Sequence, residues 1–456
     1  MKASKSYIKI LDPVYSEASK DLVGLLRENF NYTYEIWNKQ WVDKGNGKKV
    51  LRKVKKPGYM ISVKGLFLSG LIPSVTKLLD REGIDYDMSI NEDFIPPIPG
   101  IPKVKGVEFR DYQVRLIKSA SVHGRGVIKA STGSGKSLTA LGIISCYPDS
   151  KILFLCHNLS IITQTAYVFK KHGFDVSVAG GGNRDLSGQI VIGTIQTMST
   201  FKTDQVFDMF DIIFVDEVHR VNDLKSQYGK FLQNNLAPMR FGLTATLPEG
   251  KQKLLALEGL IGPVIDTFSV SEGVDQGYLA KPQIRLMTLD EQSSLSDLTR
   301  YADIYEEGIV KNKHRNGKIV KITNSYNRKG MSVLIMVKDI AHGKLLHKNL
   351  PSALFVRGMT DKEDREKVRI ALDKKEIMTV ITTTVFREGV DIPSLDVVVN
   401  ACGGKGEIMT LQAIGRGLRS TKDKSEVIVV DFLDIGKFLS IHAIKRINLY
   451  IEQGWM

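Results

Sequence analysis

The chain has 456 residues, a formal net charge of +14 and three cysteines. Its length is sufficient for about three domains with large hydrophobic cores. No apolar run approaches the roughly 20 residues that span a membrane, and the N-terminus lacks the apolar centre of a signal peptide, so we expect a cytoplasmic protein. The cysteines, Cys146, Cys156 and Cys402, are far apart and lie in or beside apolar stretches, which predicts buried thiols rather than disulfides or zinc ligands.

Residues 1–95 have the pattern of a small α+β domain. Strands are expected at 7–11 and within the alternating segment 50–63, and helical spacing is found at 16–30 and 72–83. Because this segment contains no catalytic constellation, we expect it to serve in binding or substrate selection.

A cluster of basic residues lies within this N-terminal segment. It comprises Lys44, Lys48, Lys49, Arg52, Lys53, Lys55 and Lys56, without an acidic residue between them and with Trp37, Trp41 and Tyr59 nearby. Neutralised phosphates release counterions and aromatic rings stack on bases, so Lys48, Lys49, Arg52 and Lys53 predict a contact with nucleic acid. A solvated hairpin tip is the alternative interpretation.

A proline-rich connector follows. Residues 94–103 contain four prolines and a glycine, which cannot continue a helix or a sheet, and we place a linker at 96–106. From 107 to 275, apolar runs alternate with helix-patterned segments, which predicts a parallel α/β sheet. The runs are 126–130, 151–156, 189–193, 211–215 and 241–245.

The first of these runs ends in a loop with the composition of a phosphate cradle. Gly133 and Gly135 allow tight turns that direct backbone N–H groups at phosphate oxygens, Lys136 supplies a cation, and Ser137 offers a hydroxyl to Mg²⁺. The complete loop comprises Ser131, Thr132, Gly133, Ser134, Gly135, Lys136 and Ser137, after Ala130 where the general pattern has glycine. Taken alone, this sequence is also compatible with a glycine- and serine-rich surface turn.

Two adjacent carboxylates follow the apolar run 211–215. Asp216 and Glu217 at the end of a buried strand would lose hydration unless a cation lies near them. A Mg²⁺ ion held by Ser137 and Asp216 would meet this requirement, and Glu217 would orient or deprotonate an attacking water. An acidic turn at a strand end is the alternative.

Residues 276–456 repeat the alternation, which predicts a second parallel sheet. The apolar runs are 332–337, 352–356, 378–383, 396–400 and 426–433. Before the last run, Arg416 and Arg419 are three residues apart and would share one face of a helix. Such a face fits a γ-phosphate, because arginines stabilise the charge of phosphoryl transfer, although a solvated basic turn is the alternative.

The order of these motifs resembles that of the superfamily 2 helicases of the DExH type, over about residues 107–435. FRDYQ (109–113) resembles the Q motif, ASTGSGKS (130–137) motif I, GTIQT (193–197) motif Ic, DEVH (216–219) motif II and LTAT (243–246) motif III. TTTVFREGVDIP (382–393) resembles motif V and QAIGRGLR (412–419) motif VI. Thr244 stands where motif III commonly has serine, and motif IV is hard to recognise. Within the family, the pattern is most similar to the XPB-like branch and to the phage UvsW-type branch-migration helicases.

This resemblance implies an α/β fold with two tandem RecA-like parallel-sheet motor domains, 107–275 and 276–456, preceded by the small α+β domain. It implies ATP and Mg²⁺ as cofactors, with ATP bound between the motor domains. The implied catalytic residues are Lys136, Asp216, Glu217, Gln412, Arg416 and Arg419, and the implied nucleotide-binding residues add Arg110, Gln113, Gly389 and Asp391 to the phosphate loop. The implied nucleic-acid contacts are Thr194, Gln196, Thr197, Thr382, Thr383 and Thr384, which could instead be ordinary strand-end residues. His219 would link the ATP site to motif III, or simply cap a strand end.

The leading hypothesis is a monomeric DNA-dependent ATPase that unwinds or branch-migrates forked and four-way DNA, with a single-stranded tracking strand, in replication, recombination or repair. A phage origin would place it in the cytoplasm of a bacterial host. An RNA helicase is an alternative because phosphate contacts dominate both kinds of binding, and the separate basic segment favours DNA. A duplex translocase that separates no strands is a further alternative. An ATP-gated binding protein with vestigial hydrolysis is disfavoured by the presence of Glu217, Arg416 and Arg419.

Overall fold

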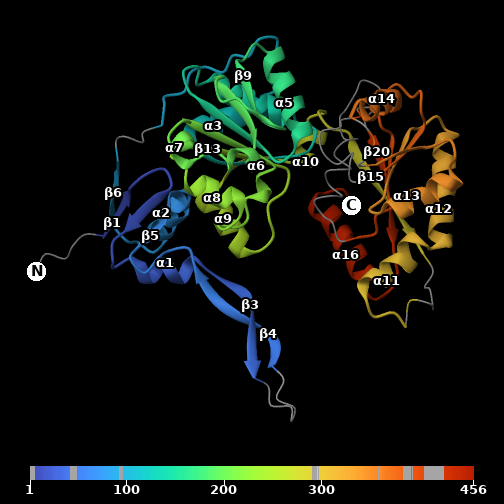
Figure 1. The fold of residues 1–456 in the computed structure, drawn as a ribbon, viewed down its shortest axis with the longest axis horizontal. Coiled ribbons are helices and arrows are strands. Elements are labelled where there is room, and N and C mark those ends of the chain that lie inside the picture. The colour runs from blue at the N-terminus through green and yellow to red at the C-terminus, as the bar shows by residue number, and fades with distance from the viewer. Residues whose placement is uncertain are drawn as a thin grey trace, which may run out of the picture. The chain divides into compact units, whose positions relative to one another are not determined.

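The computed structural model describes residues 6–41, 49–91, 96–289, 295, 297–357, 360, 362–383, 392, 394–404 and 426–456 (Figure 1). The chain divides into two compact units, the first formed by 1–129 with 137–267 and the second by 268–456 with the loop 130–136. Within the described part of the chain, no helix combines the length and apolar character needed to cross a lipid bilayer. All three cysteines are buried and free of disulfides, as the sequence predicts.

The first unit begins with a small α+β module whose sheet has the strand order β5-β2-β1-β6. Its strands are β1 (Ser6–Ile10), β2 (Tyr15–Ala18), β5 (Leu66–Leu68) and β6 (Tyr86–Ile90), and its helices are α1 (Val23–Asn29) and α2 (Ile72–Arg81). Strand β1 pairs antiparallel with β2 and parallel with β6. The α+β class predicted for this segment is therefore confirmed.

The helix predicted at 16–30 is wrong at its start. Ser16 and Ala18 are buried in β2, which pairs with β1 on one side and β5 on the other, and α1 begins only at Val23. The Ser16 hydroxyl, 2.8 Å from that of Ser69, has a buried hydrogen-bond partner. Sheet pairing on both edges of β2 therefore outweighs the local helical spacing.

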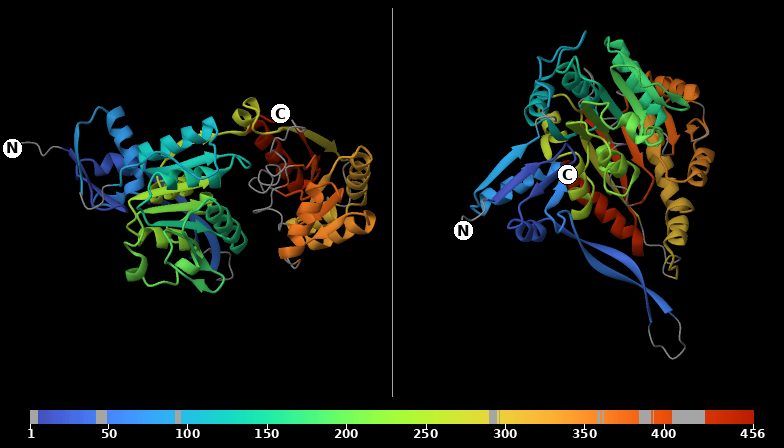
Figure 2. Two further views of the ribbon diagram at one scale, coloured as in Figure 1. Left: turned by 90° about the horizontal axis from the view of Figure 1, so that it is seen from above. Right: turned by 60° about the vertical axis from the view of Figure 1, so that its left-hand side comes forward.

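A long antiparallel hairpin leaves the module between α1 and β5, and Figure 2 shows it extending away from the module's sheet and helices. Strand β3 (Asn31–Trp41) pairs with β4 (Lys49–Tyr59), from Asn31 opposite Tyr59 to Trp41 opposite Lys49. Strands of 11 residues are about twice the usual length, which gives the ribbon its reach. The strand expected within 50–63 is thus confirmed.

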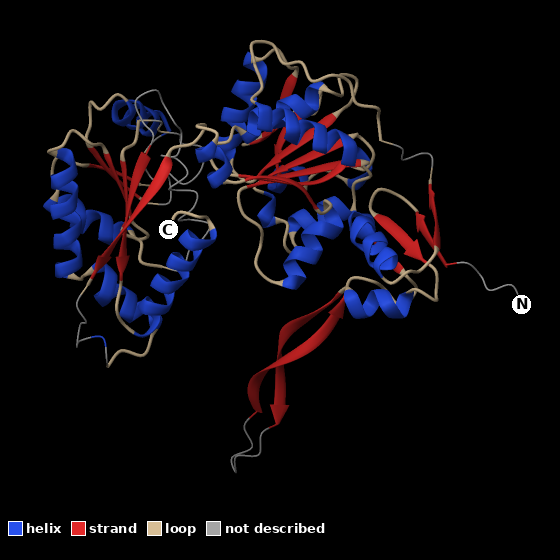
Figure 3. Ribbon diagram, turned by 180° about the vertical axis from the view of Figure 1, so that it is seen from behind, coloured by secondary structure: helices blue, strands red, loops and turns tan. Residues whose placement is uncertain are grey.

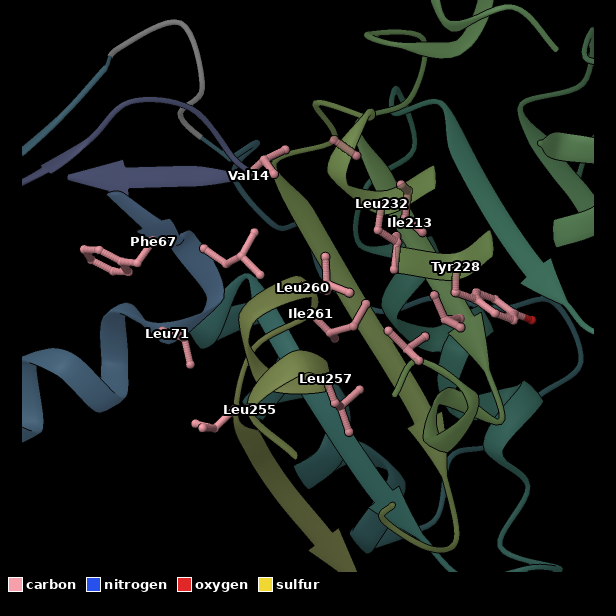
Figure 4. Close-up of a cluster of buried hydrophobic side chains, with 14 of the residues drawn as sticks. Val14, Phe67, Leu71, Ile213, Tyr228, Leu232, Leu255, Leu257, Leu260 and Ile261 are labelled. Atoms are coloured by element: carbon pink, nitrogen blue, oxygen red, sulfur yellow. The ribbon is translucent and has the colours of Figure 1, made fainter. Parts of the chain in front are cut away.

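The module shares a hydrophobic core with the rest of the first unit. Figure 4 shows Val14, Phe67 and Leu71 of the module in one cluster with four side chains that lie on or directly after helix α9 (Lys251–Leu260), namely Leu255, Leu257, Leu260 and Ile261. Each fully buried side chain of this kind contributes about 1.5–3 kcal/mol. Removing residues 1–95 would uncover this surface, so the function of the module is better tested by substitution than by deletion.

The remainder of the first unit is built on a largely parallel sheet with the order β10-β9-β11-β8-β12-β13-β7-β14 in the described residues. Its strands are β7 (Arg125–Ala130), β8 (Ile152–Cys156), β9 (Val176–Gly180), β10 (Asn183–Arg184), β11 (Ile190–Thr194), β12 (Ile212–Asp216), β13 (Met239–Thr244) and β14 (Val264–Phe268). The helices are α3 (Asp111–His123), α4 (Lys136–Ser145), α5 (Leu159–Lys171), α6 (Ile195–Met198), α7 (Thr203–Val206), α8 (Gln227–Gln233) and α9. Continuous apolar strands such as Ile212–Val215 are fully buried because helices cover both faces of the sheet (Figure 3).

The second unit contains a parallel sheet with the order β15-β20-β19-β16-β18-β17 among its described residues. Its strands are β15 (Lys281–Thr288), β16 (Val333–Met336), β17 (Leu354–Val356), β18 (Thr379–Thr382), β19 (Val397–Asn400) and β20 (Glu426–Leu433). The helices are α10 (Val270–Asp275), α11 (Tyr301–Tyr305), a π-helix (Glu306–Val310), α12 (Lys313–Asn327), α13 (Ile340–Asn349), α14 (Lys362–Asp373) and α16 (Lys437–Glu452). Two RecA-like parallel-sheet domains after a small α+β region confirm the predicted fold class.

Candidate ATP and nucleic-acid sites

Three predicted motifs leave the first sheet at the carboxyl ends of neighbouring strands. Strand β13 lies between β7 and β12, with Thr244 opposite Lys129 and Leu243 opposite Asp216. The phosphate loop follows β7 in the chain, DEVH begins at the last residue of β12, and LTAT spans the end of β13. In parallel α/β sheets, ligands bind at this edge. The strand order therefore brings together the ends of three segments that are far apart in the sequence.

The phosphate loop has the backbone of an anion cradle. Gly133 and Gly135 have φ angles of 86° and 74°, a region that favours glycine, and helix α4 begins directly after them at Lys136. The Ser131 hydroxyl is buried and has no hydrogen-bond partner among the described residues, so it remains available to a ligand oxygen. The Lys136 ammonium lies 3.4 Å from the Ala130 carbonyl oxygen. These donors fit a polyphosphate chelated by Mg²⁺.

Glu217 has an unusual backbone conformation. Its φ and ψ of 50° and 52° are left-handed, which for a non-glycine residue stores strain and is common at functional sites. The Glu217 amide donates to the Asp216 carboxylate at 3.0 Å, and Glu217 Oε2 lies 3.2 Å from His219 Nδ1. The two adjacent carboxylates therefore have different partners, the Glu217 amide for Asp216 and the His219 ring for Glu217.

His219 connects the end of β12 to the end of β13. Its Nδ1 lies 3.1 Å from the Thr244 hydroxyl, which in turn donates to the Thr246 carbonyl at 2.7 Å. The Thr244 hydroxyl already donates its proton to Thr246 O, so it can only accept from His219. The hydrogen on the His219 ring is therefore on Nδ1. The predicted contact between DEVH and LTAT is confirmed.

The residues expected to contact adenine begin helix α3. Gln113 is buried, and its side-chain oxygen accepts from the Arg110 amide at 3.1 Å, which caps the helix. The structure thus gives the Gln113 oxygen a structural partner, and contact with adenine stays a prediction.

The predicted nucleic-acid residues differ in their exposure. Thr194 is buried and caps α6, its hydroxyl accepting from the Thr197 amide at 3.1 Å, whereas Gln196 in the same turn is exposed. Thr382 and Thr383 are buried, and the Thr382 hydroxyl donates to the Thr383 carbonyl at 2.9 Å. Among the predicted contact residues whose side chains the structure describes, Gln196 is the exposed one, and contact with DNA stays a prediction.

The glycine run Gly180–Gly182 lies next to this turn. Strand β11 pairs with β8 on one side and β9 on the other, so the ends of all three strands are neighbours. A Cβ placed on Gly180 would lie 3.5 Å from the Thr194 methyl group, while Gly181 and Gly182 are exposed with φ of 63° and 92°. The sequence alone favours a flexible surface turn there, with a loop on the DNA side as the alternative. The glycine run begins at the last residue of β9, upstream of the GTIQT motif at the end of β11. This order along the chain predicts that the run lies beside the expected DNA contacts.

Several predicted residues lie outside the described residues. They are Lys48, Thr384, Gly389, Asp391, Gln412, Arg416 and Arg419. The other three members of the basic set lie on β4, where the backbones of Lys49, Arg52 and Lys53 are paired with those of Trp41, Asn38 and Trp37. Their proposed roles stay predictions.

Comparison with known proteins gives two family matches. Residues 106–249 match the family "Type III restriction enzyme, res subunit", and residues 300–421 match "Helicase conserved C-terminal domain". The chain is 25% identical over 434 residues to the ATP-dependent DNA helicase uvsW of Enterobacteria phage T4, covering 84% of this chain and 86% of the relative. It is 27% identical over 396 residues to the DNA 3'-5' translocase XPB2 of Sulfurisphaera tokodaii, covering 76% and 86%.

A solved structure supports the fold. The ATP-dependent Type ISP restriction-modification enzyme LlaBIII bound to DNA aligns with a TM-score of 0.58 at 19% identity, covering 76% of this chain and 30% of that one. At this identity the likeness concerns the fold alone.

Proposed function

The chain belongs to the superfamily 2 helicases of the XPB and UvsW type, and we propose that it is a DNA-dependent ATPase that unwinds or branch-migrates forked and four-way DNA. An ATP-dependent helicase is the coarser activity that the family matches and the uvsW relative support, and the XPB2 relative is named as a DNA translocase. The forked or four-way substrate, the monomeric state and a role in replication, recombination or repair are the proposed part.

The single observation that carries this proposal is the convergence of the phosphate loop, DEVH and LTAT at adjacent strand ends. If the loop were only a glycine- and serine-rich surface turn, the left-handed backbone conformation of Glu217, two strands away in the sheet, would have no explanation. An acidic strand end would not need the buried contact between His219 and Thr244. A site for phosphoryl transfer accounts for all three features.

The proposal assigns roles to the residues at this edge. The phosphates would lie on residues 131–137, where Lys136 neutralises charge, and Ser137 and Asp216 would hold Mg²⁺, which when bound offsets charge on the phosphoryl oxygens. Glu217 would orient the attacking water or accept its proton. Gln412, Arg416 and Arg419 would complete the site, with Arg110 and Gln113 at adenine and Gly389 and Asp391 near the nucleotide.

DNA is the proposed partner because several features of the chain fit a polyanion. The net charge is +14, both relatives carry DNA in their names, and the basic segment lies on a hairpin with two tryptophans in β3. The motor contacts would be to phosphate and sugar, which carry no base information. The N-terminal module would then select the branched substrate.

A second candidate is a duplex translocase that separates no strands. It is favoured by one finding, the similarity to a relative named as a translocase rather than a helicase. The chemistry at the ATP site would be the same, so only the products of the reaction distinguish the two.

The test measures ATP hydrolysis and strand separation with single-stranded DNA, duplex, fork, four-way junction and RNA of matched length. We expect the fork and the four-way junction to stimulate hydrolysis most and to be unwound. Lys136→Ala protein serves as the background control. Stimulation by RNA alone would refute the proposal, and hydrolysis on duplex without strand separation would favour the translocase.

A further inference from the structure

Helix α9 contacts the N-terminal module from its first residue to its last. The helix lies against β3, β5 and the 3₁₀ turn Ser69–Leu71 of the module. A Cβ placed on Gly70 would lie 2.1 Å from the Glu258 carbonyl oxygen, so the two backbones approach closely there. The module is therefore packed on a helix of the first unit and is not held by the proline-rich connector alone.

The root of the hairpin is fixed at the first turn of α9. The ammonium group of Lys251, the first residue of α9, donates to Asn29 O at 3.1 Å. The Met60 amide donates to Phe30 O at 3.0 Å, and both side chains are buried in the core cluster that includes residues of α9. The two chains of the hairpin are thus joined to each other and to α9 where they leave the module.

Tyr32 holds the next pair of the hairpin. It lies opposite Gly58, and a Cβ placed on Gly58 would lie 2.4 Å from the Tyr32 ring, so the ring lies across the partner strand. Tyr32 also packs against the core cluster, as do Leu224 and Leu247, which follow DEVH and LTAT in the chain. Burial raises the pKa of Tyr32, in agreement with this packing. One ring therefore joins both strands of the hairpin to the core of the first unit.

A second attachment lies at the other end of α9. Arg125 of β7 donates to Pro13 O of the module at 3.0 Å, and to the carbonyls of Leu260 and Ile261 at 3.3 and 3.0 Å. Arg240, which lies opposite Arg125 in the pair of β13 and β7, donates to the same Leu260 O at 3.1 Å. A movement of the module that took Pro13 O away would leave the partly buried guanidinium of Arg125 short of an acceptor, which is costly.

The two attachments together fix the direction of the hairpin. Lys251 and Leu260 are the first and last residues of α9, so the attachments are about 14 Å apart at a rise of about 1.5 Å per residue. A body held at two points this far apart cannot turn about either of them. The hairpin therefore leaves the first unit in one direction.

A fixed direction changes what a basic hairpin does. Lys55 and Lys56 of β4 are exposed beyond the root. On a flexible arm, such residues bind the phosphates of any DNA within reach, which raises the affinity for linear and branched DNA alike. An arm held in one direction meets phosphates only on DNA that has a further arm in that direction, and it loses little freedom of motion on binding. A fixed hairpin therefore selects DNA by shape.

We propose that Tyr32 and Lys251 are positioning residues that determine substrate specificity, because they hold the hairpin in one direction and so let it engage the additional arm of forked and four-way DNA. The inference rests on the proposed function, since it takes branched DNA as the substrate. Both residues act by fixing β3 and β4 on α9.

The test replaces Tyr32 and Lys251 together by Ala in the full chain. This change removes the ring that crosses Gly58 and the bond to Asn29 O, and it leaves every basic residue of the hairpin in place. Ordering one mobile side chain on binding costs roughly 2- to 10-fold in affinity, so a loosened hairpin should lower the ratio of four-way-junction to linear-duplex affinity by about 10-fold or more. Fluorescence anisotropy with DNA of equal length measures both affinities.

The salt dependence separates a loosened hairpin from lost phosphate contacts. Since the basic residues of the hairpin are unchanged, the slope of log affinity against log salt on the junction should change by less than about 1 unit. The conservative variant, Tyr32→Phe with Lys251→Arg, keeps the ring and a cationic donor, and it should retain the affinity ratio of the native chain.

The matched control is Tyr86→Ala with Lys253→Ala. Tyr86 packs against the same core from β6, which does not continue into the hairpin, and Lys253 is an exposed lysine of α9. This control removes the same side chains and charge and should keep the affinity ratio. If urea unfolding shows that the Tyr32 and Lys251 variant does not fold, Lys251→Ala alone replaces it, because that side chain is exposed, with an expected fall of roughly 2- to 10-fold.

The remaining outcomes are distinct. An unchanged ratio in the Tyr32 and Lys251 variant, with a lowered ratio when Lys48, Lys49, Arg52 and Lys53 are replaced by Ala, overturns the inference and leaves the proposed function intact. An equal loss of affinity for junction and duplex, or the same fall of the ratio in the control, also overturns the inference, since it indicates a general structural effect. Equal affinity of the native chain for the two DNAs refutes the branched substrate and the inference with it.

Discussion

At the scale of single residues, Glu217 is the side chain with the most specific geometry. A left-handed backbone at a glutamate persists only when the surrounding structure imposes it, and here it directly follows β12, whose residues Ile212–Val215 are fully buried. The two carboxylates have different partners in the structure, and the proposed function gives them different roles, Asp216 at Mg²⁺ and Glu217 at the attacking water.

The first prediction tests this division of labour. Glu217→Gln keeps the size and hydrogen bonding of the side chain but removes its charge, so ATP should bind normally and turn over roughly 10²- to 10⁴-fold more slowly. Lys136→Ala should weaken binding and turnover together. Nucleotide binding and phosphate release are measured separately, and a normal hydrolysis rate in Glu217→Gln would exclude the water-activating role.

The second prediction concerns the contact between His219 and Thr244. Thr244→Val keeps the shape of the side chain but removes the hydroxyl that contacts His219 Nδ1, donates to the Thr246 carbonyl and accepts from the Thr246 amide, so that Glu217 is left as the acceptor for the ring N–H. The loss of these hydrogen bonds should lower the free energy of unfolding of the first unit by about 1–3 kcal/mol. Thr244→Ser retains the hydroxyl and is the matched control. Urea unfolding checks both variants, and equal stability of Val and Ser would mean that the contact contributes nothing.

At the scale of elements, the sequence predicts the strands and loops whose structure is determined by the local pattern of residues. The strands β7, β8, β11, β12 and β13 were identifiable because both their faces are buried, which makes the apolar runs continuous. The phosphate loop was identifiable because its glycines have positive φ, a requirement visible in the sequence. Strand β2 was missed because its burial comes from β1 and β5, which are distant partners.

The same limit applies to the joint between the module and helix α9. The proline-rich connector suggested a separate domain, yet Arg125 at the start of β7 donates to Pro13 O at 3.0 Å and to Ile261 O at 3.0 Å. Burial lowers the pKa of Arg125 to about 10, so it remains charged at neutral pH and needs these carbonyls. Nothing in the local pattern of an arginine reveals that its partners come from residues 13 and 261.

The third prediction tests how closely this joint is packed. A Cβ at Gly70 would lie 2.1 Å from the Glu258 carbonyl oxygen, and backbone cannot move aside cheaply. Gly70→Ala should therefore lower the free energy of unfolding of the first unit by about 1–3 kcal/mol or more. Gly24→Ala in helix α1 has open space around it and should be neutral or stabilising by up to about 1 kcal/mol. Equal unfolding midpoints for the two variants would contradict the close approach.

The fourth prediction uses Glu258, whose carboxylate accepts from the Ser74 hydroxyl at the start of α2. Burial raises its pKa above the ordinary value, and the Ser74 hydrogen bond only partly opposes this. The folded state therefore favours the protonated form of Glu258. The stability that this form contributes is fully present below the pKa of the unfolded chain and is lost as pH rises through the higher pKa of the folded chain.

The stability gained by Glu258→Gln, relative to the native chain, should therefore increase between about pH 4 and pH 8. Urea unfolding across that range gives this difference, in which the other titrating groups cancel. Glu249→Gln removes an exposed carboxylate nearby and controls for the loss of charge. A difference for Glu258→Gln that falls with pH would show that the sign is wrong.

At the scale of the whole molecule, the excess of 14 positive charges is distributed over a long chain and does not by itself locate a binding surface. The hairpin is the element that concentrates charge, since β4 and the segment before it carry seven basic residues without an intervening acid. If DNA binds there, the salt dependence of affinity should depend on these residues far more than on the same number of lysines elsewhere.

The fifth prediction puts this to a quantitative test with Lys48, Lys49, Arg52 and Lys53 replaced together by Ala. Each lost phosphate contact lowers the slope of log affinity against log salt by about 0.9 on duplex DNA, so the slope should flatten by up to roughly 3 to 4 units. The control replaces four exposed lysines elsewhere, Lys77, Lys118, Lys230 and Lys348, which removes the same net charge. Affinity for fork and four-way DNA is measured over a salt series for both proteins. Equal flattening of the slope in the two proteins would mean that net charge alone determines DNA binding. An unchanged slope and an unchanged junction preference in the hairpin variant would support the alternative, that the cluster is a solvated hairpin tip.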